Sequence, residues 1–321
     1  MKRTWDGLPV AQDHPQGAMV VVRRAGAESG AEAEYLMLHR AHRGPGYEGD
    51  WAWTPPSGAR LPGEPVLAGA ARELGEEAGL TAALRPVDLS GQWAVFAADV
   101  PAGTEARLDA EHDRFDWLPA AQAERRCRPD VVAASFRRGA VAPAPALAFR
   151  PLARTDLAGL VGWMHAPHAV RWFPEDLDLA AAERKYGPRI DGRSPTRVHV
   201  ALIGGRAAGF AQHYRLRDYP AVQAACGGVD AIGIDYLIGE AGLTGRGIGP
   251  QLIWAYLQQV VFGAWPAARQ VVASPQTANR RSVRVLEKAG FSRARVIAGE
   301  QDDRPELLCV LDRQRIFGRA G

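Results

Sequence analysis

Apolar residues in the first 140 positions gather in short runs that predict β-strands around one helix. Residues 18–24, 35–40 and 93–97 are compact runs of β-branched, aromatic and other apolar side chains, and residues 112–118 suit a late strand. Residues 65–78 predict a helix, because a proline suits its first turn and a glycine follows its last. Strands arranged around a single helix indicate an α/β sandwich.

The second half of the chain has a different order of elements. We expect helices at residues 156–164, with Thr155 as the cap, at 249–262 and at 280–289. Strands are predicted around and between them, at residues 149–151, 197–203, 207–214, 231–238, 270–273 and 306–311. Two of these strands are separated by Gly204 and Gly205, which indicates a hairpin.

An uncharged stretch rich in proline and alanine, residues 139–147 (GAVAPAPAL), separates the two patterns. The length of 321 residues suits two domains with a core each. We therefore predict a first domain at residues 1–140, a linker at 141–147 and a second domain at 148–321.

Composition narrows the possible partners. The net charge is only +3 and no Lys/Arg cluster suits a phosphate backbone, so polymeric nucleic acid is not expected as a partner. The three cysteines lack the spacing of a zinc site or a disulfide framework. The N-terminus has no apolar signal region and no run is long enough to cross a membrane, so we expect a cytoplasmic protein that acts on small molecules. The oligomeric state does not follow from the sequence.

A group of carboxylates is the first candidate site. Glu73, Glu76 and Glu77 are spaced i, i+3, i+4, which places them on one face of a helix. Two interpretations follow: a solvated acidic face, or a site for a hard cation such as Mg²⁺, which prefers oxygen ligands. The surrounding residues favour the metal, because Arg72 can pair with Glu64 and Gly58 permits a tight turn next to the ion.

Residues 58–80, GARLPGEPVLAGAARELGEEAGL, fill every fixed position of the pattern G-x5-E-x7-R-E-U-x-E-E-x-G-U, where U is apolar. Over residues 17–138 the chain resembles the Nudix hydrolase family. The resemblance implies an αβα sandwich and Mg²⁺-dependent hydrolysis of a nucleoside diphosphate linked to another group. It also implies that Glu73, Glu76 and Glu77 bind the metal, that Glu76 or Glu77 positions the water, and that Arg72 belongs to the catalytic group.

Other residues of this half have open roles. Glu111 resembles a downstream carboxylate that assists the metal or the base in some members of the family, and a structural role is equally compatible with its position. Residues 51–57 (WAWTPPS) depart from the commoner glycine-rich approach to the box. We expect Trp51 and Trp53 to pack or to form a pocket wall.

A glycine-rich turn is the second candidate site. Residues 244–249 read TGRGIG between a predicted strand and a predicted helix, where backbone N–H groups and the helix N-terminus favour an anion. A P-loop is excluded because no GK[ST] follows, and the spacing does not fit the dinucleotide pattern G-x-G-x-x-G.

Residues 279–291, NRRSVRVLEKAGF, follow this turn. The combination of strand, glycine turn, helix, strand and this segment resembles the GNAT N-acetyltransferases, over residues 149–317. The resemblance implies a mixed, mostly antiparallel sheet and acetyl-CoA as cosubstrate. It implies pyrophosphate binding by Thr244, Gly245, Arg246, Gly247, Ile248 and Gly249, and pantetheine contacts from Asp235, Tyr236, Leu237, Ile238 and Asn279. The family usually has Gln or Arg where this chain has Thr244.

Several segments resemble the aminoglycoside 6′-N-acetyltransferases, including residues 163–168 (WMHAPH) and 209–214 (GFAQHY). This resemblance implies a cationic amine acceptor, with Asp235 receiving the amine proton. Asp235 also has a structural interpretation, as a residue bonded to neighbouring backbone. The residues expected to contact the acceptor are Trp172, Gln212, Tyr214, Asp235 and Asp303, with Glu240 as a further acid.

Two alternatives stay open. In the first, the acceptor is a hydroxylysine-type amine, as in a related branch that acts in siderophore assembly, or a peptide. In the second, the Nudix-like half is a binding or scaffolding module. A tyrosine that protonates the leaving thiolate in many family members is replaced here by Leu286, and His213 and Tyr256 are the substitutes that the sequence offers.

Overall fold

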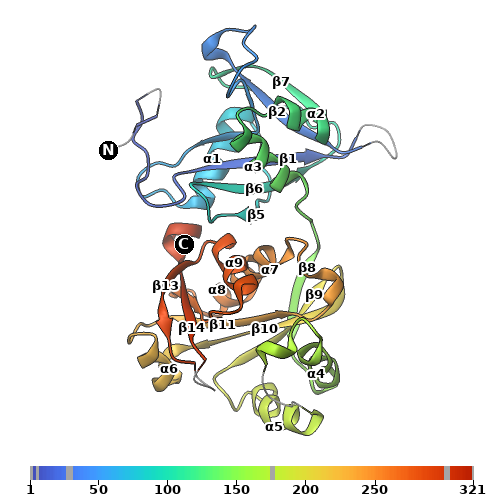
Figure 1. Cartoon of the computed structure of the whole chain (residues 1–321), viewed down its shortest axis with the longest axis vertical. Helices are drawn as coiled ribbons and strands as arrows, with labels where there is room; N and C mark the ends of the chain where they lie inside the picture. The colour runs from blue at the N-terminus through green and yellow to red at the C-terminus, as the bar shows by residue number, and fades with distance from the viewer. Residues whose placement is uncertain (1–2, 5–6, 27–31, 174–177, 300–303, 320–321) are drawn as a thin grey trace. The chain divides into compact units, whose positions relative to one another are not determined.

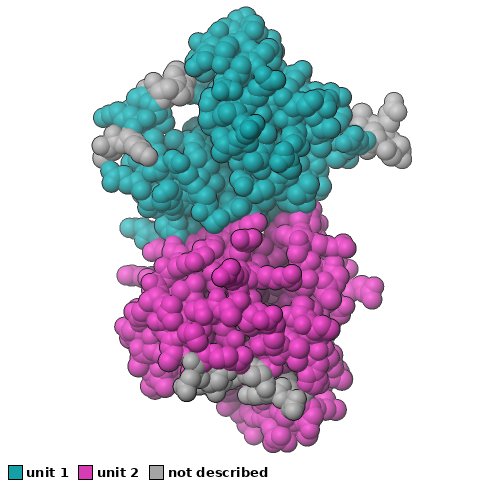
Figure 2. Space-filling model, viewed as in Figure 1, with its two compact units in different colours: residues 1–142, 314–319 teal, residues 143–313, 320–321 magenta. Residues whose placement is uncertain are grey.

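The computed structural model describes residues 3–4, 7–26, 32–173, 178–299 and 304–319. These residues form two compact units, one of residues 1–142 with 314–319 and one of residues 143–313 with 320–321 (Figure 2). The short segment 314–319, which we placed in the second domain, thus groups with the first unit. In the described part of the chain, no helix combines the length and the apolar character needed to cross a bilayer.

The first unit is a mixed sheet between helices (Figure 1). Strands β1 and β6 are parallel and paired over eight positions, whereas β2 and β4 pair with β1 in the antiparallel sense. Helices α2 and α3 cover the face that carries Met19 and Val21, and α1 lies across the other face. The elements are β1 (Gly17–Arg24), β2 (Glu34–Arg40), β3 (Trp53–Thr54), β4 (Ser57–Ala59), α1 (Val66–Ala78), β5 (Arg85–Asp88), β6 (Trp93–Val100), β7 (His112–Pro119), α2 (Ala120–Arg126) and α3 (Asp130–Ala140).

The second unit has a sheet in the order β13-β14-β12-β11-β10-β9-β8 (Figure 1). All neighbours in it are antiparallel except β11 and β12, which confirms the predicted mostly antiparallel sheet. Helices α4 and α5 cover one face, and α7 and α9 cover the other. The elements are β8 (Leu147–Pro151), α4 (Leu157–His165), α5 (Leu179–Ile190), β9 (Arg197–Ile203), β10 (Arg206–Arg215), α6 (Pro220–Ala225), β11 (Ile232–Ile238), α7 (Ile248–Tyr256), α8 (Phe262–Ala264), β12 (Gln270–Ala273), α9 (Arg280–Lys288), β13 (Ser292–Ile297) and β14 (Glu306–Asp312). The helix after β14, α10 (Arg313–Phe317), groups with the first unit from Gln314 onward.

Two local predictions differ from the structure. Thr155 does not cap α4, because a 3-10 turn precedes the helix and the Asp156 carboxylate binds the Ala153 N–H and the Arg150 guanidinium there. The proline- and alanine-rich stretch 139–147 also begins and ends in regular structure. Gly139 is the close-packed end of α3 against Val21, and Leu147 already pairs with Ile203 in β8.

A buried polar cluster holds α7 to β9 and β10. The Tyr256 hydroxyl lies 2.8 Å from Nδ1 of His213 and 3.1 Å from Nδ1 of His199. Burial, reinforced by the charge of Arg197, lowers the pKa of each histidine to about 4. Both rings are therefore neutral in the folded protein at neutral pH.

This cluster predicts an acid-sensitive second unit. Below pH 6.5 the unfolded chain binds protons at His199 and His213, whereas the folded chain binds them only near pH 4. The free energy of unfolding should therefore fall as the pH drops from about 6.5 towards 4, and hold its full value above that range. Calorimetric melting temperatures at pH 7.5 and 5 measure this fall. It should be smaller in His213→Gln, and an equal fall in that variant would contradict the assignment.

Candidate functional site

Helix α1 places two of its glutamates in the interior of the first unit. The helix ends at Gly79, whose φ of 66° is the left-handed conformation that glycine adopts without strain. Glu73 and Glu77 are one turn apart on the buried face and only 8% and 4% exposed. Glu76 lies on the outer side, with 58% of its side chain exposed.

Arg72 connects this helix to the loop before it. Its Nε and Nη2 donate to the two oxygens of Glu64 at 2.8 and 3.1 Å, which confirms the predicted pair. Its Nη1 lies 2.8 Å from a Glu76 oxygen and 2.9 Å from a Glu73 oxygen. Glu64 also accepts the Leu61 N–H, so the loop is held at two points. In this arrangement Arg72 positions the carboxylates.

Glu73 and Glu77 are enclosed by β4. Glu77 accepts the Ser57 N–H at 2.7 Å, and the Glu73 carboxylate lies so close to Gly58 that a Cβ there would stand 2.1 Å from its carbon. Burial raises the pKa of Glu73 to about 7 and that of Glu77 well above the usual value. A side chain at position 58 would therefore displace the Glu73 carboxylate.

These carboxylates fit a magnesium ion in their chemistry. Both offer hard oxygen donors, and their raised pKa values mark charges that a nearby cation would stabilise. Mg²⁺ is commonly held by one or two carboxylates together with substrate phosphates. Among the described residues, no three His, Cys, Asp or Glu side chains come together as a metal cage. Of the three predicted ligands, Glu73 and Glu77 are buried, whereas Glu76 lies on the outer side of the helix and pairs with Arg72.

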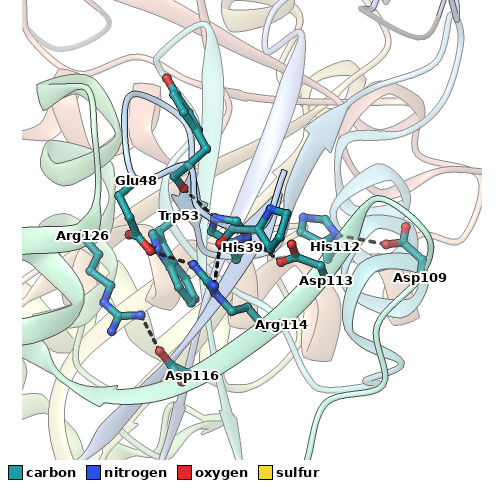
Figure 3. Close-up of polar contacts among 11 residues, drawn as sticks. His39, Glu48, Trp53, Asp109, His112, Asp113, Arg114, Asp116 and Arg126 are labelled. Atoms are coloured by element: carbon teal, nitrogen blue, oxygen red, sulfur yellow. Dashed lines mark hydrogen bonds and ion pairs between the residues drawn. The ribbon is translucent and has the colours of Figure 1, made fainter. Parts of the chain in front are cut away.

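His112 is a neighbour of this site that the sequence analysis missed. Its buried Nε2 has no hydrogen-bond partner among the described residues and lies 3.9 Å from a Glu77 oxygen. Its Nδ1 lies 3.0 Å from Asp109 (Figure 3). Glu111, the predicted downstream acid, is next to it and donates its backbone N–H to Asp109. The signal in the sequence was the local cluster of charged residues around Glu111.

The two tryptophans before the box have separate environments. Trp53 is buried and donates to Glu48 at 2.7 Å, with the guanidinium of Arg126 4.3 Å from its ring centroid (Figure 3). This confirms its packing role. Trp51 is 49% exposed and holds a φ of 65°, which is strained for a bulky residue.

The second unit has its candidate site where β11 and β12 part. These parallel strands pair only at Ile232 with Val271 and at Gly233 with Val272. Beyond those two pairs lies a cavity of about 280 Å³. It brings together Trp172, Gln212, Tyr214, Asp235, Tyr236 and Asn279 from the predicted set.

Other residues of the predicted set lie outside the cavity lining. Leu237 and Ile238 pack in the two apolar clusters on either side of the sheet. Glu240 accepts the indole N–H of Trp163 at 3.2 Å. Asp303 falls outside the described residues.

The glycine-rich turn leads directly into α7. Gly245 and Gly247 have φ values of 73° and 81°, and Gly247 is the residue before the helix. A Cβ on Gly249 would stand 2.8 Å from Val285, so this glycine lets α7 approach α9. The conformation leaves backbone N–H groups at the helix start, which is the arrangement that binds phosphate.

Asp235 is held by a chain of polar side chains. Gln212 donates to its carboxylate at 2.7 Å, and Arg189 donates to the Gln212 oxygen at 2.7 Å. Burial raises the pKa of Asp235, and the Gln212 hydrogen bond opposes that rise. Arg189 and its neighbour Lys185 line the cavity from α5 and were missed, because helical spacing alone does not mark them as site residues.

The two residues that the sequence offered as proton donors lie outside the cavity lining. His213 and Tyr256 bind each other in the buried cluster, and neither lines the cavity. Leu286 does line it, from α9.

Comparisons with known proteins agree with the division of the chain into two units. A family model described as a NUDIX domain matches residues 13–136, and one described as an acetyltransferase (GNAT) domain matches residues 153–298. The aminoglycoside N(6′)-acetyltransferases type 1 of Klebsiella pneumoniae and Serratia marcescens are each 28% identical over 178 residues, which cover 51% of this chain and 82% of the relative.

Solved structures include an aminoglycoside acetyltransferase in complex with coenzyme A. It is 27% identical and covers 53% of this chain and 96% of its own, with a TM-score of 0.45. A C. elegans Ap4A hydrolase covers 38% of this chain and 92% of its own, at 21% identity and a TM-score of 0.31. Together with the matched family models, the sheet topologies and the two sites lead to one conclusion: the chain is an enzyme that joins a Nudix hydrolase domain to a GNAT N-acetyltransferase domain.

Proposed function

We propose that the second domain transfers the acetyl group of acetyl-CoA to an amine of an aminoglycoside-like antibiotic. The observation that carries this proposal is Asp235, oriented by Gln212 inside the cavity that Asn279 also lines. The names of the relatives at 28% identity support the acceptor class. Acetylation removes the positive charge of the amine, so the activity would give resistance to the antibiotic.

The mechanism assigns one task to each part of the site. The glycine turn holds the pyrophosphate and Asn279 contacts the pantetheine arm, while backbone N–H groups of β11 polarise the thioester carbonyl. The amine nitrogen attacks the carbonyl carbon, Asp235 accepts its proton directly or through water, and the thiolate leaves. A buried carboxylate with a raised pKa is a stronger base than an ordinary aspartate.

The charge of the cavity also fits a second class of acceptor. Its described lining holds Asp235 and Glu306 but also Lys185 and Arg189, so it is not the strongly acidic pocket expected for a polycation. The two cations favour an amine that also carries a carboxylate, such as a hydroxylysine-type acceptor. A panel of aminoglycosides, ornithine-like amines and peptides separates these classes.

Asp235→Asn keeps the shape of the side chain and removes its charge. We expect kcat/KM for the preferred acceptor to fall roughly 10²- to 10⁴-fold, because a general base is lost. Thiol release from acetyl-CoA measures the rate. Asp230→Asn, an exposed residue outside the cavity lining, is the matched control and should react like the wild type. Undiminished turnover by Asp235→Asn refutes the assigned role.

We further propose that the first domain hydrolyses a nucleoside-diphosphate-type substrate with Mg²⁺. Glu73 and Glu77 carry this proposal, since two buried carboxylates side by side are stable as charges when a cation joins them. The ion, when bound, neutralises the diphosphate and activates a water. Arg72, the Ser57 N–H and Gly58 orient the two carboxylates.

Glu77→Gln tests this activity. We expect kcat/KM to fall by more than roughly 10²-fold, because even a partner of a metal ligand commonly contributes about 10- to 100-fold. Nucleoside monophosphate formed from a panel of nucleoside diphosphate derivatives with Mg²⁺, separated by chromatography, measures the change. Glu105→Gln, an exposed member of an ion pair with Arg24, is the matched control. Wild-type hydrolysis no faster than that of Glu77→Gln would favour a scaffolding role for this domain.

A further inference from the structure

The proposed acetyl transfer leaves one proton unassigned. A thioester sulfur departs as a thiolate, and a nearby donor that protonates it makes the departure easier and prevents its return. Helix α9 contributes Leu286 to the cavity, which is apolar and fully buried, so this position supplies no proton.

Tyr236 contacts the same helix one turn earlier. Its hydroxyl lies 2.9 Å from the Ser282 hydroxyl and 3.3 Å from the Ser282 carbonyl oxygen. Residues 282 and 286 are spaced i, i+4 and therefore lie on the same face of α9. Tyr236, Ser282 and Leu286 all line the cavity that contains Asp235.

The position of Tyr236 along β11 places it at the opening of the sheet. It lies three residues beyond Gly233, the last position at which β11 pairs with β12. Asp235 precedes it, and successive side chains of a strand point to opposite faces. The Asp235 carboxylate and the Tyr236 hydroxyl therefore lie on opposite faces of β11, at the point where β11 and β12 part.

The other tyrosines of the cavity are less suited to this task. Tyr186 comes from α5, and the Tyr219 hydroxyl is 2.5 Å from that of Thr196. Tyr214 lies two residues after Gln212 on β10, so these two side chains are on the same face of the sheet. The Tyr236 hydroxyl, in contrast, contacts Ser282 on α9.

We propose that Tyr236 is the general acid of the acetyl transfer and that Ser282 positions its hydroxyl. The inference rests on the proposed acetyl transfer to an amine. As the carbon–sulfur bond breaks, the electron pair stays on sulfur and the sulfur takes the Tyr236 proton. The amide nitrogen has lost its proton to Asp235, which releases it to solvent, and the tyrosinate regains one proton from solvent, so atoms and charge balance. Burial raises the pKa of Tyr236, which keeps the hydroxyl protonated between turnovers.

Tyr236→Phe removes only the hydroxyl. We expect kcat to fall roughly 10²-fold, the lower range of general acid catalysis, with the KM for acetyl-CoA nearly unchanged. Tyr47→Phe, which removes a tyrosine hydroxyl outside the cavity lining, should keep the wild-type kcat. A raised KM with an unaltered kcat in Tyr236→Phe means that the hydroxyl only binds cosubstrate, and overturns the proposal.

Two further variants separate chemistry from packing. Leu286→Tyr in the Tyr236→Phe background returns a hydroxyl to the same face of α9, and kcat should recover at least in part. Ser282→Ala should lower kcat by a smaller factor than Tyr236→Phe, because Tyr236 keeps its hydroxyl. A larger loss in Ser282→Ala than in Tyr236→Phe contradicts the division of roles.

Binding measurements test the contact independently of the acceptor. Calorimetric titration should give the wild type a higher affinity for CoA than for desulfo-CoA, and Tyr236→Phe should lose that preference. Absence of CoA binding in the wild type refutes both the proposed function and this inference. CoA binding with the same sulfur preference in Tyr236→Phe refutes this inference alone.

Discussion

Both sites depend on carboxylates that are buried with few partners. An ionised carboxylate loses its hydration on burial, and the protein must replace that stabilisation with hydrogen bonds or positive charge. Glu77 accepts one hydrogen bond from the Ser57 backbone N–H, and Glu73 forms an ion pair with Arg72. Asp235 accepts one hydrogen bond from the Gln212 side-chain amide. The raised pKa of each shows that this compensation is incomplete, which leaves room for a cation or an amine to complete it.

The two domains supply these partners differently. In the first, the helix and the loop before it are close in sequence, and Arg72 joins Glu64, Glu73 and Glu76 within a span of thirteen residues (Glu64 to Glu76). In the second, Asp235, Gln212 and Arg189 come from β11, β10 and α5, and only the sheet brings them together. The second site therefore depends more on tertiary structure.

The parting of β11 and β12 organises the transferase domain. Two paired positions suffice to join the strands, and the unpaired lengths beyond them provide backbone groups and side chains for a cosubstrate. Helices α7 and α9 both begin on one side of the sheet. Glycines of the preceding turn lead into α7, and Asn279 caps α9 by accepting the Ser282 N–H at 3.1 Å. A thioester, an amine and a proton donor need such convergence of separate elements.

The sequence alone determined what depends on local spacing. The box identified the three glutamates of α1, the Arg72–Glu64 pair and the end of α1 at Gly79, because helical periodicity and glycine conformation are local properties. The hairpin at Gly204–Gly205 and the Asn279 cap were found for the same reason.

Tertiary structure decided the partners. The outward direction of Glu76, the contact of His112 with Glu77, the Arg189–Gln212–Asp235 chain and the Tyr236–Ser282 bond join residues whose choice of partner no local pattern encodes. Thr155 failed as a cap because Asp156 already bound Arg150, a competition visible only once the chain is folded. Side-chain contacts across elements depend on which faces pack together, and that is a property of the whole domain.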